Sequence, residues 1–408
     1  MADTIYYLWL QCALGISPSL RTQEILAAFP GGAREIYAAG DYDRRVAGVF
    51  TGTQLSRLQR TPLEQAEKIL EECARHKAHI LSPQDADYPE RLLQIPNHPL
   101  VLYVRGSLAP LRAHLPLAVV GARMATFHSR DIAARLSADL VHAGCAIISG
   151  GAAGIDSAAH RGAMHADGYT LAVFGCGLDV SYPPENAAMF AKIAEKGALV
   201  SEFPFGTAPN GRNFPMRNRL IAGISAGTVI IEANEKSGSL RTAACAGDQG
   251  RDVFAVPGDA FGTTYTGGNR LIRDGAKPVF SAMDILEEYE LVYPELLDMR
   301  RAERDLERPA ADPASIPVRQ KAKPIEAKPV KANAVPTEGN FAQEINPEPA
   351  LTELESKIMQ LLSDKAMHID SIMNETNAPF GQLFAALMNL EMRALAEQMP
   401  GKLYSKRK

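Results

Sequence analysis

Three short turns of the sequence combine glycine with small or hydroxyl side chains, directly after apolar runs. The first contains the triplet GAR, the second SGG and the third SGS. Glycine lets backbone N–H groups approach an anion closely, and a helix that begins at the turn adds partial positive charge. Each turn alone is also explained as a tight strand-to-helix connection, but several together favour a phosphate-binding surface. The candidate residues are Gly121, Ser149, Gly150, Gly151, Ser237, Gly238 and Ser239.

Arginine and phenylalanine side chains accompany these turns. The candidates are Arg123 after the first turn and, from the run NFPMRNR, Phe214, Arg217, Asn218 and Arg219. Guanidinium groups match the oxygens of a phosphate, and a phenyl ring offers a face on which a base can stack, worth about 1–3 kcal/mol. These residues therefore predict contacts with a nucleic acid. The alternative is that the arginines pair with Glu202 or Glu232 and hold the sheet edge together.

Asp156 and His160 lie four residues apart, so they share one face of a helix. Together with Asp179 or Glu202 they are candidates for a metal or acid–base site. We favour a structural explanation, with Asp156 at an N-cap position and His160 a packed histidine with a hydrogen-bond partner. No HExxH motif and no Ser-His-Asp order occurs in the sequence. We therefore predict no catalytic residue.

Motifs for metals and nucleotide cofactors are missing from the sequence. The five cysteines are scattered, with no CxxC pair and no histidine at zinc spacing. The first turn reads GARMAT rather than GxGxxG, and no GxxxxGK[ST] motif supplies a P-loop lysine. We expect no metal and no cofactor.

The apolar runs before the turns are short and alternate with amphipathic stretches from Leu117 onward. Runs such as LAVVGAR, AIISGG, TLAVFG and GTVIIEA are typical of strands buried on both faces, with helices between them. This pattern predicts an α/β fold with a Rossmann-like, doubly wound, mostly parallel sheet. Ligands bind such sheets at the carboxyl ends of the strands, which is where the candidate turns lie.

The chain divides further by periodicity and composition. Residues 1–80 place apolar side chains at helical spacing and predict a small helical domain, and residues 81–295 hold the sheet together with a proline-rich entry segment. Residues 296–350 are charged and proline-rich, which predicts a disordered linker. Residues 351–408 return to helical periodicity and end in a short hairpin, the pattern of a winged helix.

Overall charge gives little attraction for a polyanion. Lys and Arg number 43 against 47 Asp and Glu, a net charge of −4. A nucleic-acid surface must then be a local patch. The N-terminus lacks the positive region of a signal peptide, and no apolar run approaches the roughly 20 residues that span a bilayer. We expect a cytoplasmic protein with no membrane partner.

Seven motifs in order resemble the Rossmann core of the DprA family, also called Smf. They are VVGAR, SGGAAGIDSAAH, AVFGCGLDVSYPPEN, VSEFPFGTAPNGRNFPMRNRLIAGIS, VIIEANEKSGSLRTA, GRDVFAVPG and GGNRLIRDGA. The N-terminal part resembles that family's SAM-like domain and the C-terminal part its winged helix. The resemblance implies a protein, not an enzyme, that binds and protects single-stranded DNA during natural transformation and helps load the RecA recombinase. It also implies a homodimer formed through the Rossmann core.

Residue by residue, the resemblance implies the same site as the turns do. The family's glycine-hydroxyl-arginine turn falls on residues 121–123, its SGG turn on residues 149–151, its FPxRNR run on residues 214–219 and its SGS turn on residues 237–239. Two positions depart from the family: Ala122 replaces a hydroxyl residue, and Ala153 stands where many relatives have arginine.

Two competing functions remain. Nucleotide phosphoribohydrolases resemble the chain more broadly, with a glycine-rich turn near SGSLRTA, and this hypothesis predicts release of a free base and loss of activity on changing Glu232. A second hypothesis makes the winged helix a reader of duplex DNA, motivated by Lys402, Lys406, Arg407 and Lys408. Its third helix carries little positive charge, so contact with a protein is at least as well supported.

Overall fold

The computed structural model describes residues 3–17 and 19–306, and farther along residues 352–362, 367–376, 378, 383, 386–387, 389–391, 395–399 and 403–406. These residues belong to two compact units, one ending at Gln320 and the other beginning at Lys321. The first unit holds a nine-stranded sheet and the second a three-stranded sheet.

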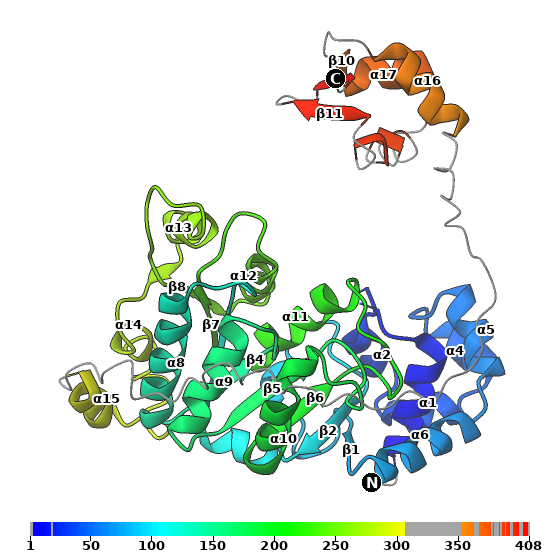
Figure 1. Ribbon diagram of the computed structural model, residues 1–408. Helices are drawn as coiled ribbons and strands as arrows, with labels where there is room; N and C mark the ends of the chain where they lie inside the picture. The colour runs from blue at the N-terminus through cyan, green and yellow to red at the C-terminus, as the bar shows by residue number, and fades with distance from the viewer. Residues whose placement is uncertain are drawn as a thin grey trace, which may run out of the picture. The chain divides into compact units, whose positions relative to one another are not determined.

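The nine-stranded sheet has the order β1-β2-β6-β5-β4-β3-β7-β8-β9 (Figure 1). Its parallel strands are β3 (Leu115–Gly121), β4 (Cys145–Ser149), β5 (Thr170–Phe174), β6 (Ala198–Ser201), β7 (Gly227–Ile231), β8 (Asp252–Ala255) and β9 (Lys277–Pro278). At one side β2 (Leu102–Gly106) pairs antiparallel with β6, and β1 (His79–Leu81) pairs antiparallel with β2. The strand order reverses between β3 and β7, so the predicted doubly wound, mostly parallel sheet is confirmed.

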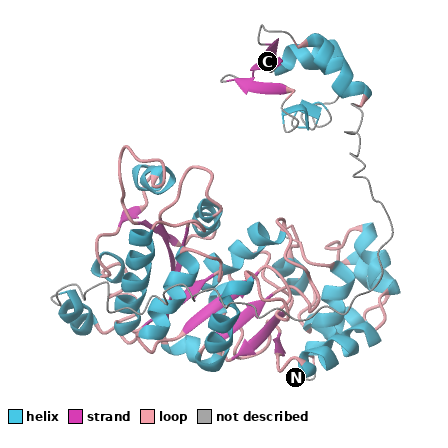
Figure 2. Cartoon of the chain, viewed as in Figure 1, coloured by secondary structure: helices cyan, strands magenta, loops and turns pink. Residues whose placement is uncertain are grey.

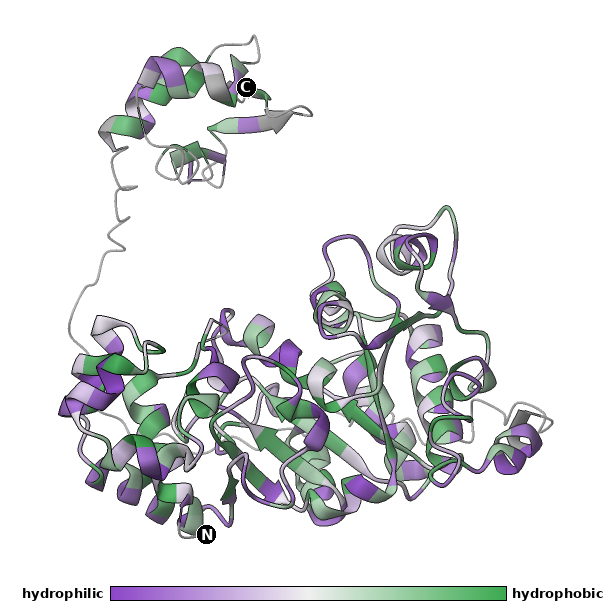
Figure 3. Cartoon of the chain, turned by 180° about the vertical axis from the view of Figure 1, so that it is seen from behind, coloured by the Kyte–Doolittle hydropathy of each residue, from purple (hydrophilic) through white to green (hydrophobic). Residues whose placement is uncertain are grey.

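Alternate residues of each strand enter different cores, which is why the strands read as continuous apolar runs. Ile147 of β4 shares a core with α8 and α9 on one face of the sheet, and Ile148 shares a core with α11 and α12 on the other face. The helices are α8 (Phe127–His142), α9 (Ile155–His165), α10 (Ala187–Lys196), α11 (Asn213–Ile224), α12 (Ser239–Asp248) and α13 (Thr266–Arg273). Figure 3 shows the hydrophobic residues gathered on the strands between these two layers of helices.

The N-terminal segment is helical, as its periodicity predicts. Its helices are α1 (Thr4–Leu14), α2 (Thr22–Ala27), α3 (Gly32–Ala38), α4 (Asp41–Val46), α5 (Gly52–Arg60) and α6 (Glu64–Arg75). All of these helices except α4 contribute to one hydrophobic cluster that also includes residues of β5, β6 and α10. Gln11 joins the two parts through polar groups as well: its Nε2 donates to Glu202 O (3.2 Å), and its Oε1 accepts from the Tyr103 hydroxyl (3.0 Å). The helices and the sheet therefore form one unit.

Short elements complete this unit: α7 (Glu90–Leu93), the 3-10 helices η1 (Ala109–Ala113) and η2 (Pro184–Asn186), and α14 (Met283–Leu286). A further helix, α15 (Met299–Leu306), lies within the range 296–350 that the composition predicts to be linker. Ala302 is buried, and Asp298 N–H donates to Ala143 O (3.0 Å). Residues 296–306 are therefore packed on the core rather than part of a linker. The rest of the predicted linker, residues 307–350, lies outside the described residues.

The second unit contains α16 (Glu353–Leu361), α17 (Ile369–Thr376) and an antiparallel sheet ordered β10-β12-β11 (Figure 2). Its strands are β10 (Met367–His368), β11 (Ala396–Met399) and β12 (Leu403–Lys406). The core includes Ile358, Ile372, Leu387 and Tyr404. Strands β11 and β12 form the predicted hairpin, although its turn at residues 400–402 is not described. Helices followed by a paired hairpin confirm the winged helix.

Candidate nucleic-acid interface

The turns singled out in the sequence meet at the carboxyl edge of the sheet, because β3, β4 and β7 are neighbours and run in parallel. Backbone hydrogen bonds join them directly. Ala122 N–H donates to Glu232 O (2.9 Å), and Ile155 N–H donates to Ala122 O (3.2 Å). Arg123 thus stands between the turn that follows β4 and the turn that follows β7.

The first turn is fixed by Glu232. The Oε2 atom of this buried glutamate accepts hydrogen bonds from Thr126 N–H (2.8 Å) and from the Thr126 hydroxyl (2.9 Å). Gly121 is required here because a Cβ at this position would lie 1.8 Å from Ile231 O. Glu232 therefore holds the turn that presents Arg123, and the guanidinium of Arg123 is exposed at the edge.

The SGG turn is filled by a side chain of the protein itself. Asp156 Oδ2 accepts from Gly150 N–H (3.2 Å) and from Ala152 N–H (3.3 Å). Ser149 is fully buried, and its hydroxyl donates to Val119 O (2.7 Å). Burial raises the pKa of the Asp156 carboxyl, whereas the positive charge of Arg217 and these two N–H donors lower it by a smaller amount. The expectation that Gly150 offers its N–H to a phosphate differs from the structure, because that N–H is already bonded.

The N-cap of α9 also differs from the expectation. Gly154 occupies the N-cap with φ 83°, a left-handed conformation that favours glycine, and Asp156 is the second residue of the helix. Asp156 lies in the first turn of α9, and its carboxylate accepts hydrogen bonds from N–H groups of the turn that precedes the helix.

Arg217 is only 4% exposed. Its Nη1 donates to Gly150 O (2.7 Å) and to Val173 O, and burial lowers its pKa to about 10. A Cβ on Gly150 would lie 2.6 Å from Nη1, so the glycine makes room for this guanidinium. The prediction that Arg217 binds a phosphate directly is corrected on this point: its guanidinium faces backbone carbonyls inside the protein.

Arg219 and Asn218 are buried as well. Arg219 Nη2 lies 2.6 Å from both carboxylate oxygens of Glu202, and both side chains are 6% exposed. This ion pair is the alternative that the sequence left open, and it is confirmed for Arg219. Asn218 Nδ2 donates to Gly238 O (3.4 Å), and its Oδ1 accepts from Arg217 Nε (3.3 Å). The run RNR on α11 therefore ties together the turns after β4, β6 and β7.

Phe214 forms an aromatic and cationic cluster with Arg123. The Cζ atom of Arg123 lies 5.1 Å from the centre of the Phe214 ring, and that of Arg217 lies 5.8 Å from it. The ring of Tyr182 lies 5.4 Å away, tilted by 33°. Tyr182 is 38% exposed and was missed in the sequence, although it stands directly before a pair of prolines after the β5 run. Within this cluster, Arg123 and Tyr182 are exposed and Phe214 is half-buried, so this part of the site is open to solvent.

The third turn is partly open. The hydroxyls of Ser237 and Ser239 are hydrogen-bonded to one another (2.7 Å), Ser239 is buried, and Gly238 is exposed as the N-cap of α12. Lys236, which is exposed, directly precedes the turn. A second exposed cation, Arg212, is the N-cap of α11, the helix whose Asn218 binds Gly238 O. Lys236 was not predicted, because one lysine in a polar loop carries no signal of its own.

The proposed metal or acid–base residues do not assemble. His160 is fully buried; Thr170 Oγ1 donates to Ile147 O, so it accepts from His160 Nδ1 (2.8 Å). Burial lowers the pKa of His160 to about 3. Asp179 binds Gly206 N–H (3.0 Å), and Glu202 is paired with Arg219. Across the described parts of the chain, no group of three or more His, Cys, Asp and Glu could hold a metal ion.

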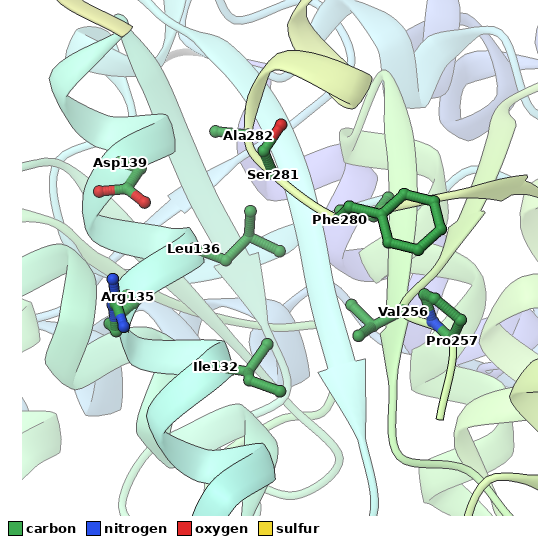
Figure 4. A pocket seen from close by; sticks show the side chains of 10 residues that line it. Ile132, Arg135, Leu136, Asp139, Val256, Pro257, Phe280, Ser281 and Ala282 are labelled. Carbon is green, nitrogen blue, oxygen red and sulfur yellow. The ribbon is translucent and has the colours of Figure 1, made fainter. Parts of the chain in front are cut away.

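A cavity of about 370 Å³ lies elsewhere on this unit, between α8 and the segments that follow β8 and β9 (Figure 4). Its lining includes Ile132, Leu136, Val256 and the largely exposed Phe280. None of the predicted DNA-binding residues lines it. In addition, the helices within the described residues are all too short or too polar to cross a lipid bilayer.

The fold and the site define a class: a doubly wound α/β protein with a helical N-terminal extension, a carboxyl-edge site of glycine turns and arginines, and a winged helix. Residues 79–290 match the family model for DNA recombination-mediator protein A, and residues 342–402 match that for the DprA winged helix domain. The chain belongs to the DprA family.

Individual proteins with Smf or DprA names are also similar to this chain. The chain is 34% identical to Protein Smf of Synechocystis over 348 residues, which cover 83% of each chain. It is 40% identical to DNA processing protein DprA of Bacillus subtilis over 49% of this chain and 68% of the relative. The X-ray structure of DprA from Streptococcus pneumoniae matches with a TM-score of 0.61 and 31% identity, covering 70% of this chain and 97% of that one.

Proposed function

We propose that this protein binds single-stranded DNA without sequence preference along the carboxyl edge of its sheet. The observation that carries the proposal is Arg123, an exposed arginine held at the edge by the turn that Glu232 fixes and resting on Phe214. Arg123 forms no ion pair with any residue that the structure describes. Its charge is therefore available for an external anion, in a chain of the DprA family.

The mechanism follows from the cluster around Phe214. A phosphate draws the guanidinium of Arg123 off the aromatic ring, which frees a face of Phe214 next to Tyr182 for an unpaired base. Arg212 and Lys236 supply further positive charge along the same edge. Phosphates carry no base identity, and every base has a face that can stack, so binding is independent of sequence.

The buried members of the predicted site act by holding this surface in shape. They are Ser149, Gly150, Gly151, Arg217, Asn218, Arg219 and Ser239. Their hydrogen bonds join the turns after β4, β6 and β7 before DNA arrives, so little ordering is needed on binding. The members with solvent access, Gly121, Arg123, Phe214, Ser237 and Gly238, would make the contacts.

At the level of the cell, we propose that the chain works in the cytoplasm, protects incoming single strands in natural transformation and helps load RecA onto them. It would do so as a homodimer through the Rossmann core, as a binding protein rather than an enzyme. Membership of a family described as recombination-mediator proteins supports this role. Glu232, Asp156 and His160 form hydrogen bonds within the protein, which favours a structural role for them over the nucleotide-hydrolysis alternative.

A mobility-shift comparison of single-stranded and duplex DNA tests the proposal. The wild type should bind the single strand more tightly, and Arg123→Ala should weaken that binding by about 10-fold, in the range of one lost charge-assisted contact. Arg60→Ala, an exposed arginine at the end of α5, is the control and should bind as the wild type does. Release of a free base from nucleotides, without binding to oligonucleotides, would refute the proposal.

A further inference from the structure

Two exposed arginines stand near the N-terminal ends of neighbouring helices, in the first turn of α8 and the second turn of α9, outside the site described so far. Arg130 lies on α8, where its Nε donates to Ala125 O (3.1 Å), and Arg161 lies on α9, where its Nη2 donates to the Ser157 hydroxyl (3.2 Å). Helices α8 and α9 pack side by side on the same face of the sheet (Figure 1).

Both side chains bend back toward the carboxyl edge. Ala125 belongs to the turn that carries Arg123, so Arg130 is fastened to that turn. Ser157 in turn donates to Gly154 O (3.1 Å), and the next residue, Ile155, is bonded to Ala122 O. Arg130 and Arg161 are therefore connected, from two helices, to the turn that presents Arg123.

The charges of this pair have no acidic partner among the described residues. Neither arginine forms an ion pair with the residues for which the structure gives a placement. Asp156, the acidic side chain at the start of α9, is buried and engaged by Gly150 and Ala152. Although Arg161 is exposed, partial desolvation by the surrounding protein, and next the charge of Arg130, lower its pKa, the latter as expected for like charges held near one another.

Both guanidinium groups also have N–H donors beyond those used in these contacts. A guanidinium has five N–H groups, and the oxygens that these two arginines contact are neutral carbonyl and hydroxyl oxygens. Between Arg123 and Arg130 the chain exposes two apolar side chains, Met124 (95% exposed) and Phe127 (56% exposed). Paired cations beside exposed apolar groups are the combination that suits a single strand, with its phosphates and unpaired bases.

We propose that Arg130 and Arg161 form a second phosphate-binding site for the strand bound at Arg123, so that the DNA leaves the carboxyl edge over the first turn of α8 and the first two turns of α9. Its ligand class is the phosphodiester backbone of a single-stranded nucleic acid, with Met124 and Phe127 in contact with bases on the way. This inference rests on the proposed function and adds a direction and a length to the binding path.

The experiment measures the affinity of the full chain for oligothymidylates of about 5 and about 20 nucleotides, over a range of salt concentrations. The double variant Arg130→Gln/Arg161→Gln should bind the short strand as the wild type does. It should bind the long strand about 10-fold more weakly, with the slope of log affinity against log salt reduced by about 1.4, or 0.7 for each lost contact. The double variant with lysine at both positions should recover most of this loss, because it restores the charges.

Other outcomes separate the two proposals. If Arg123→Ala weakens binding of both strands but the double glutamine variant weakens neither, this second site does not exist, while the proposed function stands. An equal loss for both lengths would also overturn the second site, because it would place the arginines at the first one. If the wild type binds neither strand, the proposed function itself fails. Circular dichroism melting of each variant shows that the comparison is made on folded protein.

Discussion

Arg123 and Arg217 flank the same phenyl ring but have opposite environments. Arg123 is exposed, whereas Arg217 is 4% exposed and bonded to the carbonyls of Gly150 and Val173. An arginine in solvent contributes charge, and an arginine bonded to buried carbonyls contributes structure. The two side chains should therefore respond to substitution in different ways.

We expect Arg217→Ala to destabilise the larger unit by about 3 kcal/mol, because it leaves buried carbonyls without donors and opens a cavity. Arg123→Ala should change the free energy of unfolding by no more than about 0.5 kcal/mol, as surface substitutions do. Urea denaturation of both variants measures the difference. Equal and small effects of the two substitutions would mean that Arg217 does not stabilise the fold. The sequence-based prediction that Arg217 contacts DNA would then be favoured again.

Substitution of Gly150 gives a second test, of the close contact between this glycine and the Arg217 guanidinium. An added Cβ would lie 2.6 Å from Arg217 Nη1 and 2.7 Å from its Cζ atom, and this guanidinium is held in place by hydrogen bonds to Gly150 O and Val173 O. Gly150→Ala should therefore displace the guanidinium and destabilise the fold by about 1–3 kcal/mol, as overpacking does. In Arg217→Ala the obstacle is gone, so adding Gly150→Ala should cost much less. A double-mutant cycle by denaturation measures this coupling, and strictly additive effects would contradict the contact.

At the level of elements, α11 is the part that organises the edge. Its residues Arg217, Asn218 and Arg219 reach the turns after β4 and β7 and the Glu202 carboxylate after β6. The pair of Arg219 and Glu202 is buried. Burial raises the pKa of Glu202, and the charge and hydrogen bond of Arg219 lower it by a smaller amount. Removing one partner leaves the other charge buried and unpaired.

Accordingly, Glu202→Ala should destabilise the fold by about 3–5 kcal/mol. Replacing both partners, as in Glu202→Leu/Arg219→Met, should recover much of the loss, because no unpaired charge is left. Thermal melting of the single and double variants measures this recovery. If the double variant is less stable than both single variants, the pair has a role beyond charge compensation.

The elements were easier to predict than the site residues. Alternating apolar runs predicted the strands and the edge at which GAR, SGG and SGS meet, because burial on both faces leaves a clear pattern in sequence. The same pattern does not say which way an arginine points, so Arg123 and Arg217 looked alike. Nor does it show that Asp156 occupies the SGG turn, since that contact depends on how the turn folds back over α9. Tyr182 joins the site only through tertiary packing on Phe214.

At the scale of the whole molecule, every proposed DNA contact lies in the larger unit, which includes the N-terminal helices and the sheet. The winged helix has its own core and forms the smaller unit. A chain that ends at Gln320 should thus bind single-stranded DNA within about 2-fold of the full chain, as expected for independent sites. Filter binding or anisotropy measures the two affinities. A large loss for the single strand would show that the winged helix is part of the site, and a loss for duplex DNA alone would identify it as a reader of duplexes.

The central claim is that Arg123 at the carboxyl edge neutralises a phosphate of a single strand, and salt dependence tests it most directly. The measurement is a titration of a short labelled oligothymidylate at several salt concentrations with the wild type, Arg123→Ala and Arg60→Ala. With Arg123, Arg212 and Lys236 each bound to one phosphate, the slope of log affinity against log salt should be about −2 for the wild type and for Arg60→Ala, and about −1.4 for Arg123→Ala. A wild-type slope near zero, or the same slope in all three proteins, would contradict the account.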